Sequence, residues 1–170
     1  MFKAQDIREN GPRALETKNR GAFTPMPKPY YNFIFGFLMA FTSPALASEE
    51  AIKMRKYNMQ RADETMSAIK DNILKSNYSQ AREEARFIHH WASTMLDYFP
   101  RGSGASITNS SAASNEIWTN FTAFQNLITD KKKTAGEMIK FAKNSDAPNL
   151  LRAFNATRNV CNACHERFRN

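Results

Sequence analysis

The sequence predicts an all-α protein with the architecture of an antiparallel, up-and-down four-helix bundle. Two observations support this prediction. Apolar residues recur three and four positions apart along four segments, which is the spacing of amphipathic helices. No segment shows the sustained two-residue alternation that a half-buried strand requires. Four such helices within about 120 residues are sufficient for one bundle.

The first two helices are predicted at about residues 49–75 and 79–99. The first carries an a/d stripe of apolar residues seven apart: Ile52, Met59, Met66 and Ile73. The second has its apolar residues on one face: Ala85, Ile88, Ala92, Met95 and Phe99. Asn77 or Ser79 is expected to cap the second helix, because a short polar side chain can accept a hydrogen bond from the first turn.

The other two helices are predicted at about 115–144 and from about 148 to the end. The apolar face of the third is formed by Ile117, Phe121, Phe124, Ile128, Ala135, Met138 and Ala142. That of the fourth is formed by Leu151, Phe154, Val160, Cys164 and Phe168. Residues 100–114 are rich in Gly, Ser and Asn, which predicts a long loop between the second and third helices.

Residues 28–47 have the pattern of a secretory signal peptide. Lys28 precedes an apolar run at 30–41, and Ala45-Leu46-Ala47 supplies an A-x-A site, so cleavage is expected after Ala47. The run is shorter than the roughly 20 apolar residues of a membrane span. A buried core helix, the alternative, would leave the cleavage site unexplained. Residues 1–27 are a polar leader or reflect a start codon assigned too far upstream, and 48–170 form a single domain.

The charge of the predicted mature chain is moderate. Residues 1–47 hold 6 of the 24 Lys and Arg and 3 of the 16 Asp and Glu, so the remainder has 18 and 13, a net charge of +5. This surplus does not indicate a nucleic-acid partner. The run Lys131-Lys132-Lys133 is expected to be a solvated helix face, with a partner-docking patch as the alternative. No catalytic pattern of paired carboxylates, Ser-His-Asp or a Gly-rich phosphate loop is present, so no enzyme is predicted.

The most specific motif is Cys161-Asn162-Ala163-Cys164-His165, a C-x-x-C-H sequence of the kind that attaches c-type haem. Its two thiols add across the haem vinyl groups as thioethers, and the imidazole ligates the iron. On a helix, positions 161, 164 and 165 share one face. The chain has no other cysteine. We therefore predict one covalent haem c per chain, with His165 as the proximal iron ligand.

Two other interpretations of the motif are weaker. A redox C-x-x-C is disfavoured because no βαβ pattern surrounds the pair. A structural zinc site takes four ligands, and only His89 and His90 remain as obvious donors. The predicted signal peptide agrees with haem attachment, which takes place outside the cytoplasm, and the predicted location is the periplasm.

The order of motifs in residues 49–170 resembles the cytochrome c-prime family, including its low-spin, methionine-ligated relatives. The resemblance rests on the segments Met54–Met59, Phe99–Gly104, Glu116–Trp118 and Cys161–His165, with Phe168-Arg169 after the last. It implies an up-and-down bundle with haem near one end, often as a homodimer. The position of the haem motif supports it, because ordinary small cytochromes c carry the motif near the N-terminus.

The resemblance also implies roles for three further residues. Met59 matches the position that faces the distal side of the iron, where low-spin members use a methionine as the sixth ligand. The alternative is that Met59 only packs in the core stripe. Arg55 matches the arginine that pairs with a haem propionate, or is a solvated surface residue. Arg169 matches an arginine on the proximal side, or complements the C-terminal end of a helix.

Two functions follow from these alternatives. With Met59 on the iron, the protein is a periplasmic one-electron carrier that meets a redox partner protein. With the sixth position open, it is a five-coordinate cytochrome c-prime that binds nitric oxide or carbon monoxide. Neither requires a membrane span after cleavage, and a homodimer is possible in both.

Export and haem attachment can be tested together. Intact mass spectrometry of the periplasmic protein should give the mass of residues 48–170 plus one haem. Replacing Cys161 or Cys164 by Ala should leave the haem loosely held or absent. A chain that retains residues 28–47, or a haem-free mass for the unmodified sequence, would contradict this prediction.

Overall fold

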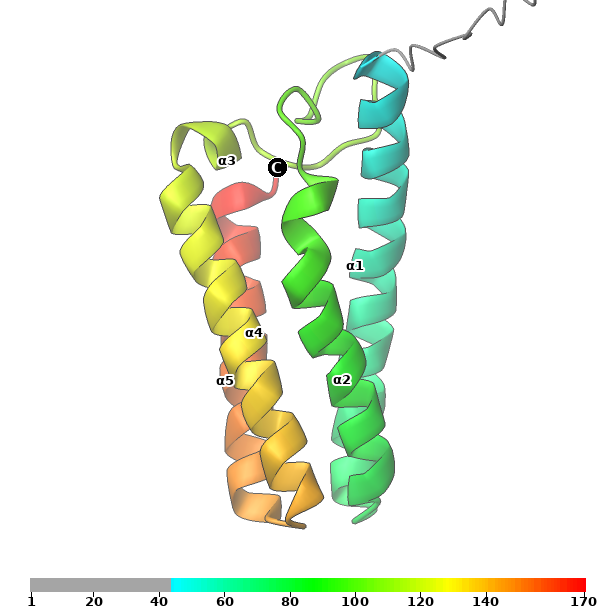
Figure 1. Ribbon diagram of the computed structural model, residues 1–170, viewed down its shortest axis with the longest axis vertical. Helices are drawn as coiled ribbons and strands as arrows, with labels where there is room; N and C mark the ends of the chain where they lie inside the picture. Colours follow the sequence, from blue (N-terminus) through cyan, green and yellow to red (C-terminus); the bar gives the residue numbers. More distant parts are fainter. Residues whose placement is uncertain (1–43) are drawn as a thin grey trace, which may run out of the picture. The chain divides into compact units, whose positions relative to one another are not determined.

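The computed structural model describes residues 44–170, and these residues form a bundle of antiparallel helices (Figure 1). The elements in chain order are α1 (Pro44–Leu74), α2 (Tyr78–Thr94), the 3₁₀ turn η1 (Met95–Tyr98), α3 (Glu116–Thr119), α4 (Phe121–Lys143) and α5 (Ala147–Phe168). Within this part of the chain, β-structure is limited to one isolated bridge, Ala113 to Arg169. The predicted all-α four-helix bundle is therefore confirmed. The leader and residues 28–43 of the predicted signal peptide lie outside the described residues.

The helix bounds differ from the prediction in one respect. The expected continuous helix over 115–144 is interrupted at Asn120, whose backbone (φ −118°, ψ 42°) leaves the helical region. Its Nδ2 donates to Oε1 of Glu116, 3.2 Å away. Asparagine favours such local hydrogen bonds over a helix interior, which explains the division into α3 and α4.

Tight turns reverse the chain between the helices of each hairpin. The side chain of Asn77 accepts a hydrogen bond from the backbone N–H of Gln80, so the predicted cap of α2 is confirmed. Asp146 caps α5 in the same way by accepting from the N–H of Asn149, 3.2 Å away. Ser145, directly before it, adopts φ +54° to close the turn between α4 and α5.

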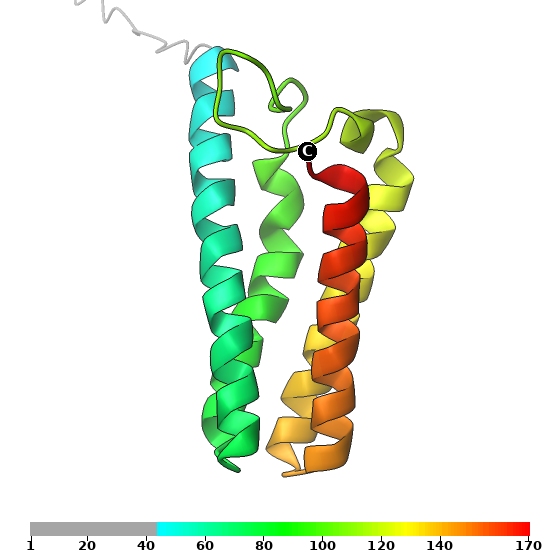
Figure 2. The ribbon, with the colours of Figure 1, turned by 180° about the vertical axis from the view of Figure 1, so that it is seen from behind.

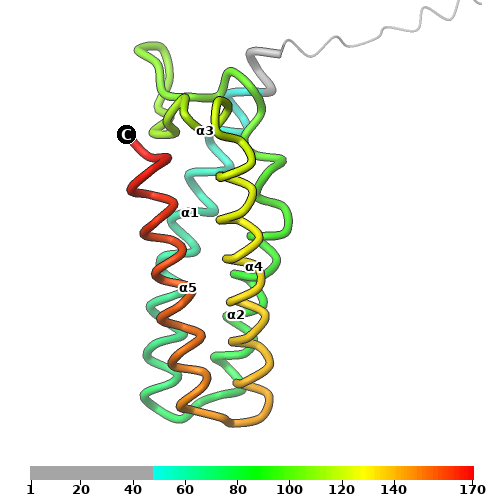
Figure 3. Tube along the Cα trace, turned by 90° about the vertical axis from the view of Figure 1, so that its left-hand side faces the viewer, coloured from blue at the N-terminus to red at the C-terminus, as the bar shows by residue number. Residues whose placement is uncertain are grey.

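The four long helices pack as two hairpins that meet along one seam. α1 packs mainly on α2, α5 mainly on α4, and α2 lies against α4 (Figures 2 and 3). Small buried residues allow this close approach: Ala81, Ala85 and Ala92 on α2, and Ala135 and Ala142 on α4. Gly136 faces α2, because a Cβ at that position would lie 3.7 Å from Cδ2 of His89. The contact between α1 and α5 is much smaller, so the bundle is looser along that side.

Most residues of the predicted apolar faces are buried; Met59, Val160 and Cys164 are partly buried, and two residues are exposed. Phe121 is 37% exposed because it is the first residue of α4, just after the break at Asn120. Leu151 is 43% exposed, whereas its neighbour Leu150 is fully buried. The buried face of α5 continues four residues before Phe154, and that position is Leu150. The predicted placement of Phe121 and Leu151 in the core was wrong.

The predicted long loop ties the end of α5 to the rest of the bundle. The N–H of Ser114 donates to the carbonyl of Phe168, and the N–H of Asn170 donates to the carbonyl of Ala112, both at 2.9 Å. Arg167 also pairs with Glu116 of α3 at 2.8 Å. These contacts hold the last turn of α5 against the loop.

Leu150 and Leu151 offer a matched test of the core. Leu150→Ala should lower the free energy of unfolding by about 2–5 kcal/mol, because it removes a fully buried side chain and leaves a cavity. Leu151→Ala should cost below about 1 kcal/mol. Urea unfolding of the two variants measures both, and equal losses would contradict the assignment of the buried face.

Candidate functional site

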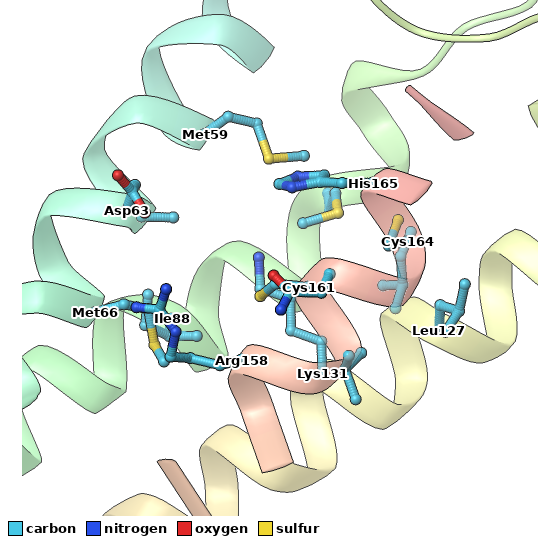
Figure 4. A pocket seen from close by; sticks show the side chains of 15 residues that line it. Met59, Asp63, Met66, Ile88, Leu127, Lys131, Arg158, Cys161, Cys164 and His165 are labelled. Carbon is cyan, nitrogen blue, oxygen red and sulfur yellow. The ribbon is translucent and has the colours of Figure 1, made fainter. Parts of the chain in front are cut away.

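A pocket opens between α1 and α5, on the looser side of the bundle (Figure 4). Its volume is roughly 740 Å³ when the part open to solvent is included. Apolar side chains from α1, α2, η1 and α4 line most of it: Ala62, Met66, Ile88, Met95, Leu127 and Ile128. Four polar residues also line it: Asp63 on α1, Lys131 on α4, and Arg158 and Asn162 on α5.

All three reactive residues of the C-x-x-C-H motif line this pocket. Cys161, Cys164 and His165 lie on one face of α5, as the spacing i, i+3, i+4 predicts. Both cysteines are free thiols and are partly buried. Within residues 44–170 no group of three or more His, Cys, Asp or Glu side chains is placed to hold a metal ion. The zinc interpretation therefore has no support from the geometry.

The electrostatics of the pocket favour neutral donor groups. Burial raises the pKa of the Cys164 thiol to about 11, and the charge of Lys131 acts in the opposite direction. Burial also lowers the pKa of His165, as do the positive charges of Arg169 and Lys131, against a smaller opposite effect of Asp63. A neutral imidazole has a free lone pair, which is the form that binds a metal ion.

Met59 lies on the opposite wall of the same pocket. It belongs to the apolar stripe of α1, but it is only half-buried, whereas Ile52 and Met66 of that stripe are buried. Its side chain points from α1 toward His165 on α5 (Figure 4). The structure therefore places a thioether and an imidazole on two sides of one space.

Arg55 lies one helical turn before Met59, outside the pocket lining, and is 4% exposed. Its guanidinium donates to the loop: Nη1 to the Tyr98 carbonyl and to Oγ of Ser103, and Nη2 to the Ser103 carbonyl and to Oγ of Ser111, at 2.7–3.1 Å. It also stacks on the Phe99 ring, 4.5 Å from the centroid. The predicted propionate contact remains a prediction, and it would have to use Nε–H or displace a loop acceptor.

Arg169 follows α5 directly and is exposed. Its backbone N–H donates to the carbonyl of His165 and so closes the last turn. It does not line the pocket, but its charge reaches His165 and lowers the pKa of that imidazole. This agrees with a place near the proximal side, although the predicted role stays untested.

The burial of Lys131 contradicts the prediction that the run Lys131-Lys132-Lys133 is a solvated helix face. Lys132 and Lys133 are exposed, as expected for a solvated face, but Lys131 is only 7% exposed and lines the pocket. The sequence contained the signal. Position 131 belongs to the series of buried residues on α4, spaced four and three apart: Phe124, Ile128, Lys131, Ala135, Met138 and Ala142. The run of three lysines concealed this periodicity.

The donor set and the lining fit a covalently attached haem. Two thiols with two residues between them and an adjacent imidazole share one helix face, and the remaining wall is mostly apolar. Covalent attachment of a flat apolar macrocycle with a metal centre uses this combination of thiols, imidazole and apolar wall. Residues 50–169 match the family model of Cytochrome C′. The chain belongs to the cytochrome c′ family.

Solved structures of cytochromes c′ have the same fold. A cytochrome c′ with ligand-controlled dimer dissociation is 22% identical, with a TM-score of 0.67, over 72% of this chain and 95% of that chain. Cytochrome c′ from Thermochromatium tepidum is 25% identical, with a TM-score of 0.66 and the same coverage. A nitric oxide complex of a cytochrome c′ variant from Alcaligenes xylosoxidans is 17% identical, with a TM-score of 0.64, over 72% and 95%. No match was found among curated proteins.

Family membership makes this chain a haem-binding protein. The two cysteines are consistent with covalent attachment, because both line the pocket and neither is engaged in a disulfide. No helix in residues 44–170 is long and apolar enough to cross a membrane.

The hydrogen bonds of Arg55 generate a test of the loop. Arg55→Lys keeps the charge but loses the planar fork of donors, so it cannot reproduce the hydrogen bonds to Tyr98, Ser103 and Ser111 together. Limited proteolysis should then cleave residues 100–114 about tenfold faster or more. Lys56→Arg, at the exposed neighbouring position, is the control and should leave the rate unchanged. Equal rates in the two variants would mean that the loop does not depend on Arg55.

Proposed function

We propose that this cytochrome c′ is a periplasmic one-electron carrier with a single covalent haem and six-coordinate iron. Cys161 and Cys164 would form the thioethers, His165 would be the proximal ligand, and Met59 the distal ligand. The observation that carries the proposal is the position of Met59, whose thioether points across the pocket toward His165 (Figure 4).

When bound, the haem supplies an iron that alternates between its ferric and ferrous states. Every other part of the function is performed by the chain. Partial desolvation and the charges of Arg169 and Lys131 lower the pKa of His165, which favours the neutral imidazole whose lone pair can bind a metal ion. Met59 offers a soft, polarisable sulfur that favours the ferrous state. The apolar residues around them limit water in the pocket and so reduce the rearrangement that accompanies electron transfer.

Exposed residues of the motif and of α4 would suit a redox partner. His165 is exposed, so the motif lies close to the protein surface. Lys132 and Lys133 are exposed on α4, beside the buried Lys131, and would favour an acidic partner surface. Export through the predicted signal peptide would place the carrier in the periplasm.

Gas binding is the second candidate function. One structural neighbour is a nitric oxide complex of a cytochrome c′ variant. Met59 is unbranched and only half-buried, so its side chain has room to leave the sixth position. A homodimer would be compatible with either function, and one neighbour is a cytochrome c′ dimer whose dissociation is ligand-controlled.

Replacing Met59 separates the two functions. The wild-type ferrous protein should be low-spin, with sharp split absorption bands, and should bind carbon monoxide slowly because a thioether must leave. Met59→Leu should give high-spin iron and fast binding. The swap conserves volume and should cost less than about 1.5 kcal/mol, so the bundle survives.

Met66→Leu is the matched control, because Met66 lines the same pocket from the same helix but is buried in the core. Its spectrum should equal that of the wild type. A high-spin wild-type protein whose spectrum Met59→Leu does not change would contradict electron transfer through six-coordinate iron and favour the gas-binding function.

A further inference from the structure

Lys131 is the least expected residue of the pocket. It occupies a core position of α4, between Ile128 and Ala135, where an apolar side chain would pack. Its side chain extends from α4 toward Cys161 (Figure 4). Burying a lysine without a partner costs free energy, because the ammonium group loses its hydration. A chain that keeps a cation at such a place indicates a use for its charge.

The charge of Lys131 is not neutralised by its surroundings. None of the ion pairs within residues 44–170 includes Lys131, and no hydrogen bond from its Nζ is found there. The acidic side chain that lines the pocket is Asp63 on α1, and it is exposed to solvent. Arg158, also exposed, adds a second positive charge to the lining. Burial lowers the pKa of Lys131, and Cys161 and Cys164 raise it by a smaller amount.

We propose that the positive charge of Lys131 raises the reduction potential of the haem. Its ammonium group would lie beside the thioether edge of the haem without an acidic partner. This inference rests on the proposed haem site but does not depend on which residue occupies the sixth position of the iron.

The position beside the thiols decides which part of the haem Lys131 would meet. The vinyl groups that react with Cys161 and Cys164 lie on one edge of the macrocycle, and the propionates lie on another. An ammonium group next to both sulfurs is therefore at the thioether edge and has no carboxylate to pair with. This distinguishes Lys131 from an arginine that holds a propionate.

The effect on the potential follows from charge and burial. Reduction lowers the positive charge at the iron by one unit, so a nearby cation destabilises the ferric state more than the ferrous state. Lys131 is only 7% exposed and lines the pocket that the haem would fill, so with haem bound its field would be screened less than that of an exposed charge. Lys132 and Lys133 carry the same charge on the same helix, but solvent and salt screen them.

Redox titration of the haem-loaded protein at neutral pH provides the test. Lys131→Met removes the charge and keeps the unbranched shape. At a fixed applied potential this variant should have a ratio of ferrous to ferric protein about tenfold lower or more. A tenfold change corresponds to a fall of about 59 mV in the reduction potential of a one-electron couple. Lys132→Met is the matched control and should shift the potential much less. The difference between Lys131→Met and the wild type should persist at high salt.

A second measurement separates this role from simple packing. If Lys131 is retained for its charge, Lys131→Met should unfold at the same urea concentration as the wild type or at a higher one, because an apolar side chain suits the core position better. A side chain needed only for packing would give the opposite result. Lys131→Arg should keep most of the wild-type potential.

The outcomes separate this inference from the proposed function. A covalent haem with unchanged potential in Lys131→Met, or a shift equal to that of Lys132→Met, overturns the inference and leaves the proposed function standing. High-spin iron in the wild type defeats the proposed function, yet the comparison of potentials still decides the role of Lys131. A chain without haem overturns both.

Discussion

The hydrogen bonds of Arg55 are the interaction on which the arrangement of the pocket depends. The helices that carry the two opposed donor groups, α1 and α5, pack on each other over only a small area. Arg55 joins α1 to the loop through Ser103 and Ser111, and the backbone of that loop is hydrogen-bonded to the end of α5. The loop therefore links the two walls directly, in addition to the packing that runs from α1 through α2 and α4 to α5.

This arrangement divides the bundle into a rigid side and an open side. Alanines on both helices let α2 and α4 approach closely, and this seam carries much of the buried core. A bundle packed equally tightly on all sides would have no room for a macrocycle. The loose α1–α5 side provides that room, and the C-x-x-C-H motif lies where α5 faces it. The α2–α4 pair thus contributes much of the buried core, whereas the α1–α5 pair provides the site.

The sequence was sufficient for the features that depend on local pattern. The helix faces, the cap at Asn77 and the common face of Cys161, Cys164 and His165 follow from spacing and side-chain chemistry. Features set by tertiary contacts were missed. The break at Asn120 and the resulting exposure of Phe121 were missed too, although the hydrogen bond from Asn120 to Glu116 is local. The role of Arg55 in the loop depends on Ser103 and Ser111, which are 48 and 56 residues away in the chain. The burial of Lys131 could have been predicted from the periodicity of α4. Because Lys132 and Lys133 follow it, all three lysines were predicted to be solvated.

The central claim is that α1 and α5 provide one donor each to the same iron, Met59 from one side and His165 from the other. X-ray absorption at the iron edge of the reduced, haem-loaded protein tests this most directly. We expect one sulfur scatterer in the first coordination shell beside the nitrogens of the macrocycle and the imidazole. A five-coordinate iron with nitrogen neighbours alone would contradict the claim and leave Met59 as a residue of the pocket wall.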